Sequence, residues 1–145
     1  MIQRIQTIFL ALASGSFFSQ FGLAFAKSTE SEPGFFSDLV YNIHDHVGLL
    51  VLTILGAIVS LAAIFLYNNR PLQLRIAYIG IVLAVILPAL ALFLFFSTGY
   101  KLDAANSIND SAGIYIPVLS IILLALAARF IGKDEKLVRS SDRLR

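Results

Sequence analysis

Three stretches of the sequence contain no charged residue and are long enough to cross a lipid bilayer. They are Val47–Tyr67, Ile76–Phe96 and Ala112–Ala128. The first two have 21 residues each, and a helix of that length, at about 1.5 Å per residue, reaches across a hydrocarbon layer of roughly 30 Å. The third extends to Ile131 if the side chain of Arg129 reaches the lipid headgroups. Each stretch therefore predicts a membrane-spanning helix.

The composition agrees with membrane insertion. Hydrophobic residues make up 58% of the chain and charged residues 14%, whereas soluble domains have about 45–50% and about 25%. A soluble fold of 145 residues with this composition would have too few polar side chains to cover its surface. The chain has no cysteine, which excludes disulfides, thiolate chemistry and Cys-ligated zinc or iron–sulfur sites. Its basic residues lie beside the predicted spans, so nucleic acid is not an expected partner.

The first apolar run, Ile5–Ala26, has two interpretations. With Arg4 before it and Ala24–Ala26 at its end, it imitates a secretory signal peptide with a cleavage site. However, the run continues well past the usual apolar segment of a signal peptide, through Phe17, Phe18, Phe21, Leu23 and Phe25. The prediction is therefore a retained first membrane helix.

The basic residues indicate the orientation of the spans. One side of the predicted membrane has only Lys27 and Lys101. The other side has the remaining nine: Arg4, Arg70, Arg75, Arg129, Lys133, Lys136, Arg139, Arg143 and Arg145. Because Lys and Arg concentrate in cytoplasmic loops, both termini are predicted to be cytoplasmic.

Small residues at helical spacing are expected to let the helices approach closely, because lipid tails compete with large apolar side chains as packing partners. The predicted packing positions are Gly15, Ser19, Gly56, Ser60, Gly80 and Ala84. Pro88 is expected to kink the third span. The predicted fold is all-α, a polytopic membrane protein forming one four-helix bundle over residues 1–145. Its expected parts are spans 5–26, 47–67, 76–96 and 112–131 and a cytoplasmic tail, 132–145, that forms a short amphipathic helix.

The segment Asn42–Gly48 contains the only two histidines of the chain, His44 and His46, on either side of Asp45. These three side chains are candidate ligands for a metal ion or a small ligand at the outer surface. On a helix the two histidines would point apart, whereas an extended segment would place them on one side. Further ligands would have to come from Asp38, Asp103 or Asp110. The alternatives are a pH-sensitive contact and a helix cap made by Asp45.

Apart from Arg129 near the end of the fourth, no predicted span contains Asp, Glu, Lys, Arg or His. Ion pathways, proton relays and haem ligation inside a membrane need such residues, and the sequence has no nucleotide-binding or hydrolase motif. The chain is therefore predicted to be no enzyme and to carry no cofactor. A small-molecule carrier with an uncharged pathway is an alternative if a polar cavity forms near Gln20, Thr53 and Ser60.

Charged residues at both ends of the chain are the other functional candidates. They are expected to contact anionic lipid headgroups, a membrane-protein partner or a second copy of the chain: Arg4, Arg129, Lys133, Lys136, Arg139 and Arg143. The leading hypothesis is a non-enzymatic structural or accessory membrane subunit that docks partners through its cytoplasmic ends.

The start "MIQRIQT" and the end "KDEKLVRSSDRLR" resemble those of a family of small bacterial four-span membrane proteins, domain of unknown function 4293. The resemblance covers the chain from end to end. It implies an intact first helix, four spans in the bacterial inner membrane and no assigned activity, and it transfers no catalytic residue to this sequence.

Overall fold

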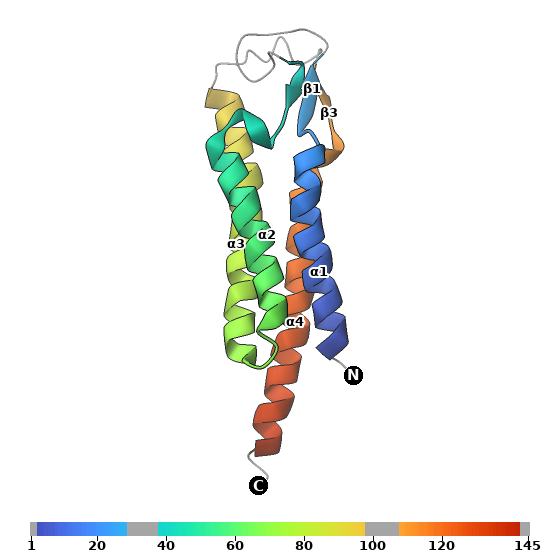
Figure 1. The fold of residues 1–145 in the computed structure, drawn as a ribbon, viewed down its shortest axis with the longest axis vertical. Helices are drawn as coiled ribbons and strands as arrows, with labels where there is room; N and C mark the ends of the chain where they lie inside the picture. The colour runs from blue at the N-terminus through green and yellow to red at the C-terminus, as the bar shows by residue number, and fades with distance from the viewer. Residues whose placement is uncertain (1–2, 29–37, 98–107, 143–145) are drawn as a thin grey trace.

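A computed structural model describes residues 3–28, 38–97 and 108–142 of the chain, which form four long helices and a small three-stranded sheet (Figure 1). Helix α1 packs against α2 and α4, and α3 also packs against α2 and α4, so the four helices form a square. Their bounds are α1 (Gln3–Ser19), α2 (Val47–Phe65), α3 (Arg70–Ser97) and α4 (Ile116–Asp142).

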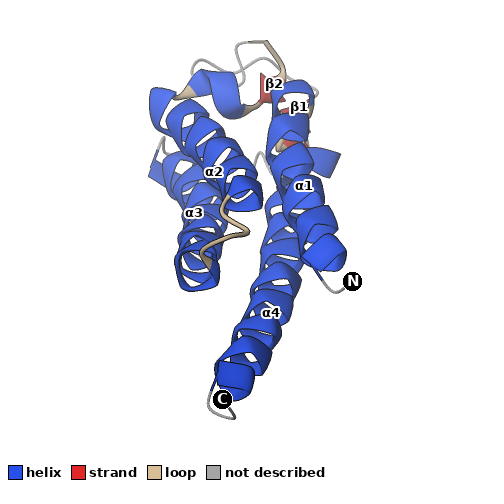
Figure 2. Cartoon of the chain, turned by 60° about the horizontal axis from the view of Figure 1, so that its bottom comes forward, coloured by secondary structure: helices blue, strands red, loops and turns tan. Residues whose placement is uncertain are grey.

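The two ends of the bundle differ in structure. The sheet lies at one end and both chain termini lie at the other (Figures 1 and 2), and we call these the sheet end and the terminal end. Strand β1 (Ala26–Ser28) is central and pairs antiparallel with β2 (Val40–Tyr41) and with β3 (Ile108–Asp110). The all-α prediction missed this sheet. Its strands have two or three residues each and are held by backbone hydrogen bonds between connections far apart in the sequence, which no local pattern reveals.

The first predicted span, 5–26, ends too late. Helix α1 stops at Ser19, a 3₁₀ turn covers Gln20–Gly22, and the chain then extends into β1. The extended backbone is held by the N–H of Phe25, which donates to the carbonyl of Tyr41 at 2.7 Å. Pairing with the sheet thus competes with the helix for these backbone groups.

Two other boundaries also differ from the prediction. Helix α3 begins at Arg70, and the side chain of Asn69 caps it by accepting the Leu72 N–H at 3.2 Å. The connection between α2 and α3 is therefore shorter than residues 68–75, which separate the two predicted spans. Helix α4 continues to Asp142, so the predicted tail 132–145 is no separate helix. Helix α3 passes through Pro88 without ending.

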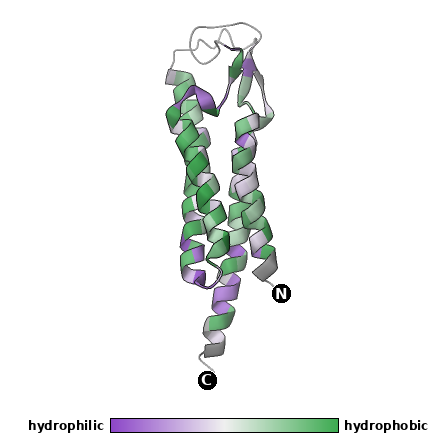
Figure 3. Cartoon of the chain, viewed as in Figure 1, coloured by the Kyte–Doolittle hydropathy of each residue, from purple (hydrophilic) through white to green (hydrophobic). Residues whose placement is uncertain are grey.

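Among the described residues, three helical segments are long and apolar enough to cross a membrane: Val47–Phe65, Arg70–Ser97 and Ala112–Val138. In Figure 3 these helices are green along most of their length, with purple at the start of α3 and along the lower part of α4. Helix α1 has 17 residues, several of them polar, and is not among the three.

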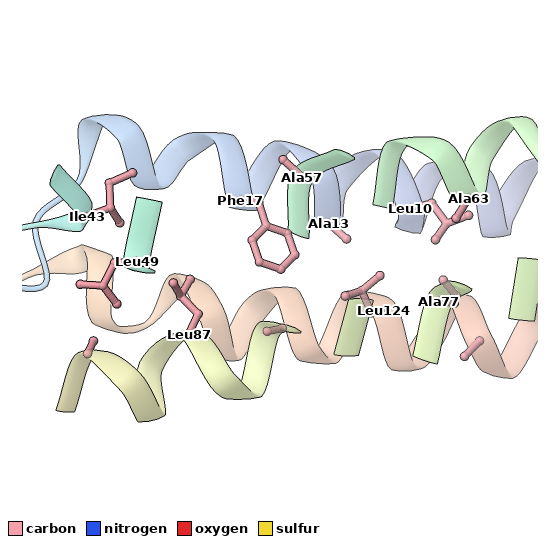
Figure 4. Packing of buried hydrophobic residues seen from close by; sticks show 14 of the residues in the cluster. Leu10, Ala13, Phe17, Ile43, Leu49, Ala57, Ala63, Ala77, Leu87 and Leu124 are labelled. Carbon is pink, nitrogen blue, oxygen red and sulfur yellow. The ribbon is translucent and has the colours of Figure 1, made fainter. Parts of the chain in front are cut away.

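Most buried residues of each helix follow one spacing, alternately four and three residues apart, and Ser14, Ser16, Ala57 and Ala128 are buried beside these series. The series are Gln6, Leu10, Ala13, Phe17 and Gln20; Leu49, Thr53, Gly56, Ser60 and Ala63; Gln73, Ala77, Gly80, Ala84, Leu87 and Ala91; and Pro117, Ser120, Leu124, Ala127, Ile131 and Asp134. This seven-residue repeat is typical of helices that pack side by side with knobs-into-holes contacts. Figure 4 shows Leu10, Phe17, Leu124 and other members of the series between the helices.

Four of the six predicted packing positions lie in these buried series. Gly56 lies against the ring of Phe17, and Gly80 lies against Leu124, whose methyl carbons would be 3.2 and 3.3 Å from an added Cβ. Ser60 and Ala84 are also buried. Two further positions, on α1, differ from the prediction.

The predicted packing face of α1 is wrong. Gly15 is exposed, and a Cβ built on it would meet nothing within 4 Å. Ser19 is half-buried and donates to the Ser16 carbonyl of its own helix. Helix α1 instead turns Gln6 inward, and Gln20 of the 3₁₀ turn that follows it is also buried.

Candidate functional site at the terminal end

The predicted contact residues of α4 lie on its last turns. Arg129, Lys133 and Lys136 are all exposed. With Glu135, they line a groove of about 590 Å³ between α3 and α4. The side chains of Arg4 and Arg139, and the whole of Arg143, lie outside the described residues.

Aromatic side chains attach the start of α1 to this part of α4. The rings of Phe9 and Phe130 stack with their centroids 5.6 Å apart and their planes 6° from parallel. The Nζ of Lys133 lies 5.9 Å from the centroid of the Phe130 ring, within the range of a cation–π contact. The beginning of α1 and the charged part of α4 therefore belong to one packed unit.

Asp134 lies in the charged C-terminal motif of the sequence, but its burial was not expected. It is 4% exposed, and its backbone carbonyl accepts a hydrogen bond of 3.0 Å from Nη1 of Arg70 at the start of α3. The signal that could have found it is the seven-residue repeat, which continues from Leu124 and Ile131 to Asp134. A charged residue on the buried stripe is costly unless it is compensated.

Two buried glutamines occupy the same end of the bundle. Gln73 donates from Nε2 to the carbonyl of Ala63 at 2.9 Å, which connects α3 to α2. The Oε1 atoms of Gln6 and Gln73 and the Oδ2 atom of Asp134 are buried without a hydrogen-bond partner among the described residues. The terminal end thus has a polar interior below a basic surface.

Beyond Asp134 the helix leaves the bundle. Figure 1 shows the last turns of α4 extending past the turn between α2 and α3. Leu137 and Val138 are 57% and 46% exposed on this projecting segment, next to charged neighbours. These two large apolar side chains are thus exposed beyond the predicted span 112–131.

At the sheet end, the His44-Asp45-His46 segment forms two successive caps. The Asn42 side chain accepts the N–H of His44 at 2.7 Å, and Oδ2 of Asp45 accepts the N–H of Asn42 at 2.6 Å, a reciprocal capping box. Nδ1 of His46 accepts the N–H of Gly48 at 3.0 Å and caps α2. The cap interpretation expected this arrangement, except that His46, and not Asp45, caps the long helix.

The two histidines have no further ligand beside them in the described part of the chain, where no group of three His, Cys, Asp or Glu residues could hold a metal ion. Asp103, one of the expected third ligands, lies outside that part. Nδ1 of His46 is occupied by the cap, and His44 lies against Phe21, with ring centroids 6.0 Å apart. The geometry supports a structural role for these residues.

The sequence profile of the family described as Domain of unknown function (DUF4293) matches residues 2–144. The chain belongs to this family. The resemblance expected from the two ends of the sequence is confirmed, and it extends over nearly the whole chain. Comparison with curated proteins found no match, and comparison with solved structures found none. The role of this DUF4293 protein must therefore be inferred from its own residues.

The residues expected to line an uncharged pathway in the DUF4293 protein use their donor groups inside the bundle. Nε2 of Gln20 donates to the Gly113 carbonyl at 2.9 Å, connecting α1 to the turn before α4. The hydroxyl groups of Thr53 and Ser60 donate to carbonyls one turn earlier in α2, at 2.8 and 2.7 Å. The Gln20 bond joins two separate segments of the chain, whereas the Thr53 and Ser60 bonds lie within α2, and none of the three donor groups points at a passing solute.

Asp45 of the DUF4293 protein lies outside the spans, and burial is the main cause that raises the pKa of its carboxyl above the ordinary value. The charge of Asp38 raises this pKa further, while the Asn42 N–H and His44 oppose the shift. Because the folded state binds this proton more tightly than the unfolded state, the contribution of Asp45 to stability is present at low pH and is lost as pH rises through the raised pKa.

Asp45→Asn is expected to remove this dependence, since the amide keeps an acceptor for the Asn42 N–H but does not ionise. The melting temperature of the variant relative to the wild type should therefore rise between about pH 3 and about pH 7. Thermal unfolding followed by circular dichroism at several pH values measures it. If the difference in melting temperature between Asp45→Asn and the wild type stays constant or falls with pH, the raised pKa of Asp45 is contradicted.

Proposed function

We propose that this DUF4293 protein is a non-enzymatic accessory subunit of the bacterial inner membrane that crosses the bilayer four times and keeps both termini in the cytoplasm. Three apolar helices support the membrane location. The excess of Lys and Arg at the terminal end supports the orientation.

The packing of α1 supports a fourth crossing. The Phe9–Phe130 stack joins α1 to α4 at the terminal end. At the sheet end, the Gln20–Gly113 hydrogen bond joins the turn that follows α1 to the turn that precedes α4. Helix α1 therefore runs beside α4 along its apolar part. Its outward face has large apolar side chains suited to lipid: Ile5, Ile8, Leu12 and Phe18. Three of its polar residues, Gln6, Ser14 and Ser16, are buried on the inward face.

The projecting end of α4 is the observation that carries the docking role. Asp134 is still buried against the bundle, but the helix continues to Asp142, with Leu137 and Val138 exposed. A helix that only fixes topology has no need of two exposed apolar residues beyond the predicted span, 112–131. We assign to this segment the contact with a cytoplasmic partner subunit.

A photo-crosslinking amino acid placed at Leu137 tests this assignment. In cells, it is expected to give a discrete adduct with a partner protein or with a second copy of the chain. The same amino acid at Phe93 is the control, because Phe93 is 68% exposed on the apolar part of α3 and should face lipid. Equal absence of protein adducts at both positions, together with a strictly monomeric particle in mild detergent, would contradict the docking role.

A further inference from the structure

The groove between α3 and α4 has the shape of a binding site. One wall is formed by Leu74 and Tyr78, which lie one helical turn apart on α3. The opposite wall is hollowed by Ala128 and Gly132 of α4, also one turn apart. A Cβ built on Gly132 would meet no atom within 4 Å, so this position opens onto free space.

The rim of the groove is basic. Arg129, Lys133 and Lys136 follow one another at intervals of four and three residues, which places them on one face of α4. Against these three cationic side chains the lining includes one acidic residue, Glu135. The local field therefore favours an anion, and guanidinium and ammonium groups bind phosphate oxygens through charge-assisted hydrogen bonds.

The groove lies at the level where the hydrocarbon of a bilayer gives way to headgroups. The apolar part of α4 ends at the buried Ala128, and the charged part begins at Arg129, as the colour change along α4 in Figure 3 shows. Tyr78 lies near the start of the uncharged stretch 76–96 of α3 and is 56% exposed, as is typical of interfacial tyrosines. The order of an apolar wall followed by a cationic rim matches the order of acyl chain and phosphate in a phospholipid.

We propose that this groove binds one anionic phospholipid, with the headgroup phosphate held by Arg129, Lys133 and Lys136 and an acyl chain lying against Leu74 and Tyr78. This site goes beyond the docking role and does not depend on it, because the docking residues Leu137 and Val138 are not part of the groove lining.

The test uses the full chain, purified in a neutral detergent and washed free of lipid. Its melting temperature is measured with increasing dioctanoyl phosphatidylglycerol, dioctanoyl phosphatidylcholine or inorganic phosphate, at one ionic strength. A saturable rise is expected with phosphatidylglycerol alone. For Arg129→Gln/Lys133→Gln, the apparent dissociation constant should increase about 25-fold, at about five-fold per basic residue removed. An equal rise with phosphatidylcholine or with inorganic phosphate would overturn the lipid assignment.

Gly132→Leu distinguishes lipid binding in the groove from attraction of lipid by diffuse surface charge. It fills the hollow without changing any charge, and the free space at this position lets the variant fold, which melting without lipid verifies. It is expected to lose the phosphatidylglycerol response. Arg75→Gln is the control, because Arg75 is an exposed basic residue of the same end outside the groove lining, and it should respond as the wild type does. Wild-type affinity in Gly132→Leu or in Arg129→Gln/Lys133→Gln would overturn the proposal.

Discussion

Replacing Gly56 with valine is expected to lower the free energy of unfolding by about 2–3 kcal/mol. Gly56 lies where α2 meets Phe17 of α1, and a Cβ at this position would overlap the Phe17 ring. The ring is 1% exposed and closely packed, so the added side chain must push α1 and α2 apart. Unfolding of the purified protein in mixed micelles, followed by circular dichroism, measures the loss.

Gly15→Val is the matched control for Gly56→Val. Gly15 is on the neighbouring helix, is exposed and has nothing within 4 Å of an added Cβ, so its stability change should stay within about 0.5 kcal/mol. The two substitutions add the same atoms to a glycine. Equal destabilisation by both would show that the contact between Gly56 and Phe17 does not determine how α1 and α2 pack.

A double-mutant cycle tests the same contact from the other side. Phe17→Ala removes the ring that a larger residue at position 56 would strike, although it destabilises the bundle by itself through the cavity that it leaves. In that background the penalty of Gly56→Val should shrink by at least about 1 kcal/mol. Strictly additive losses would contradict the contact.

Gly113→Ala is expected to cost about 2–4 kcal/mol, because the obstacle is backbone and cannot rotate away. The added Cβ would overlap the carbonyl of Ala24, which also accepts the Gly113 N–H at 2.9 Å. Relieving the overlap breaks this hydrogen bond and moves the Gly113 carbonyl away from Nε2 of Gln20. Thermal unfolding measures the cost, and the amide of Gly113 should exchange with solvent faster.

Gly22→Ala is the control at the sheet end. Gly22 lies two residues before Ala24, is exposed, and an added Cβ meets nothing within 4 Å. Its unfolding should match that of the wild type. If Gly113→Ala and Gly22→Ala melted alike, the close approach between Ala24 and Gly113 would not be what joins the sheet to the start of α4.

The part of the candidate site that sequence reasoning predicted is the part contributed by one helix. Arg129, Lys133 and Lys136 stand out because a basic run follows an uncharged one. Leu74 and Tyr78 could not be predicted as their neighbours, since they belong to another helix and only the packing of α3 on α4 brings them opposite. Asp134 was grouped with the charged tail, although its spacing from Ile131 continues the buried stripe.

The face of α1 shows why small residues were a poor guide to packing. Gly15 and Ser19 have the spacing of a helix contact, yet Gln6 and Gln20 are the residues that are turned inward. A glycine is tolerated against lipid, whereas an amide facing lipid leaves its hydrogen-bonding groups unsatisfied. Where polar and small residues compete for the inward face, the polar side chains decide.

Of the four spans that the sequence predicted, three correspond to helices that are long and apolar enough to cross a membrane, and α2 starts where it was expected, at Val47. Length and the absence of charge decide that property, and both are local. Only the tertiary structure decided which face of each helix is buried, that the chain after Gly22 extends into a sheet, and that a groove lies beside Gly132. In a helix that is apolar all round, every face is acceptable to lipid, so the buried face depends on side chains of other helices.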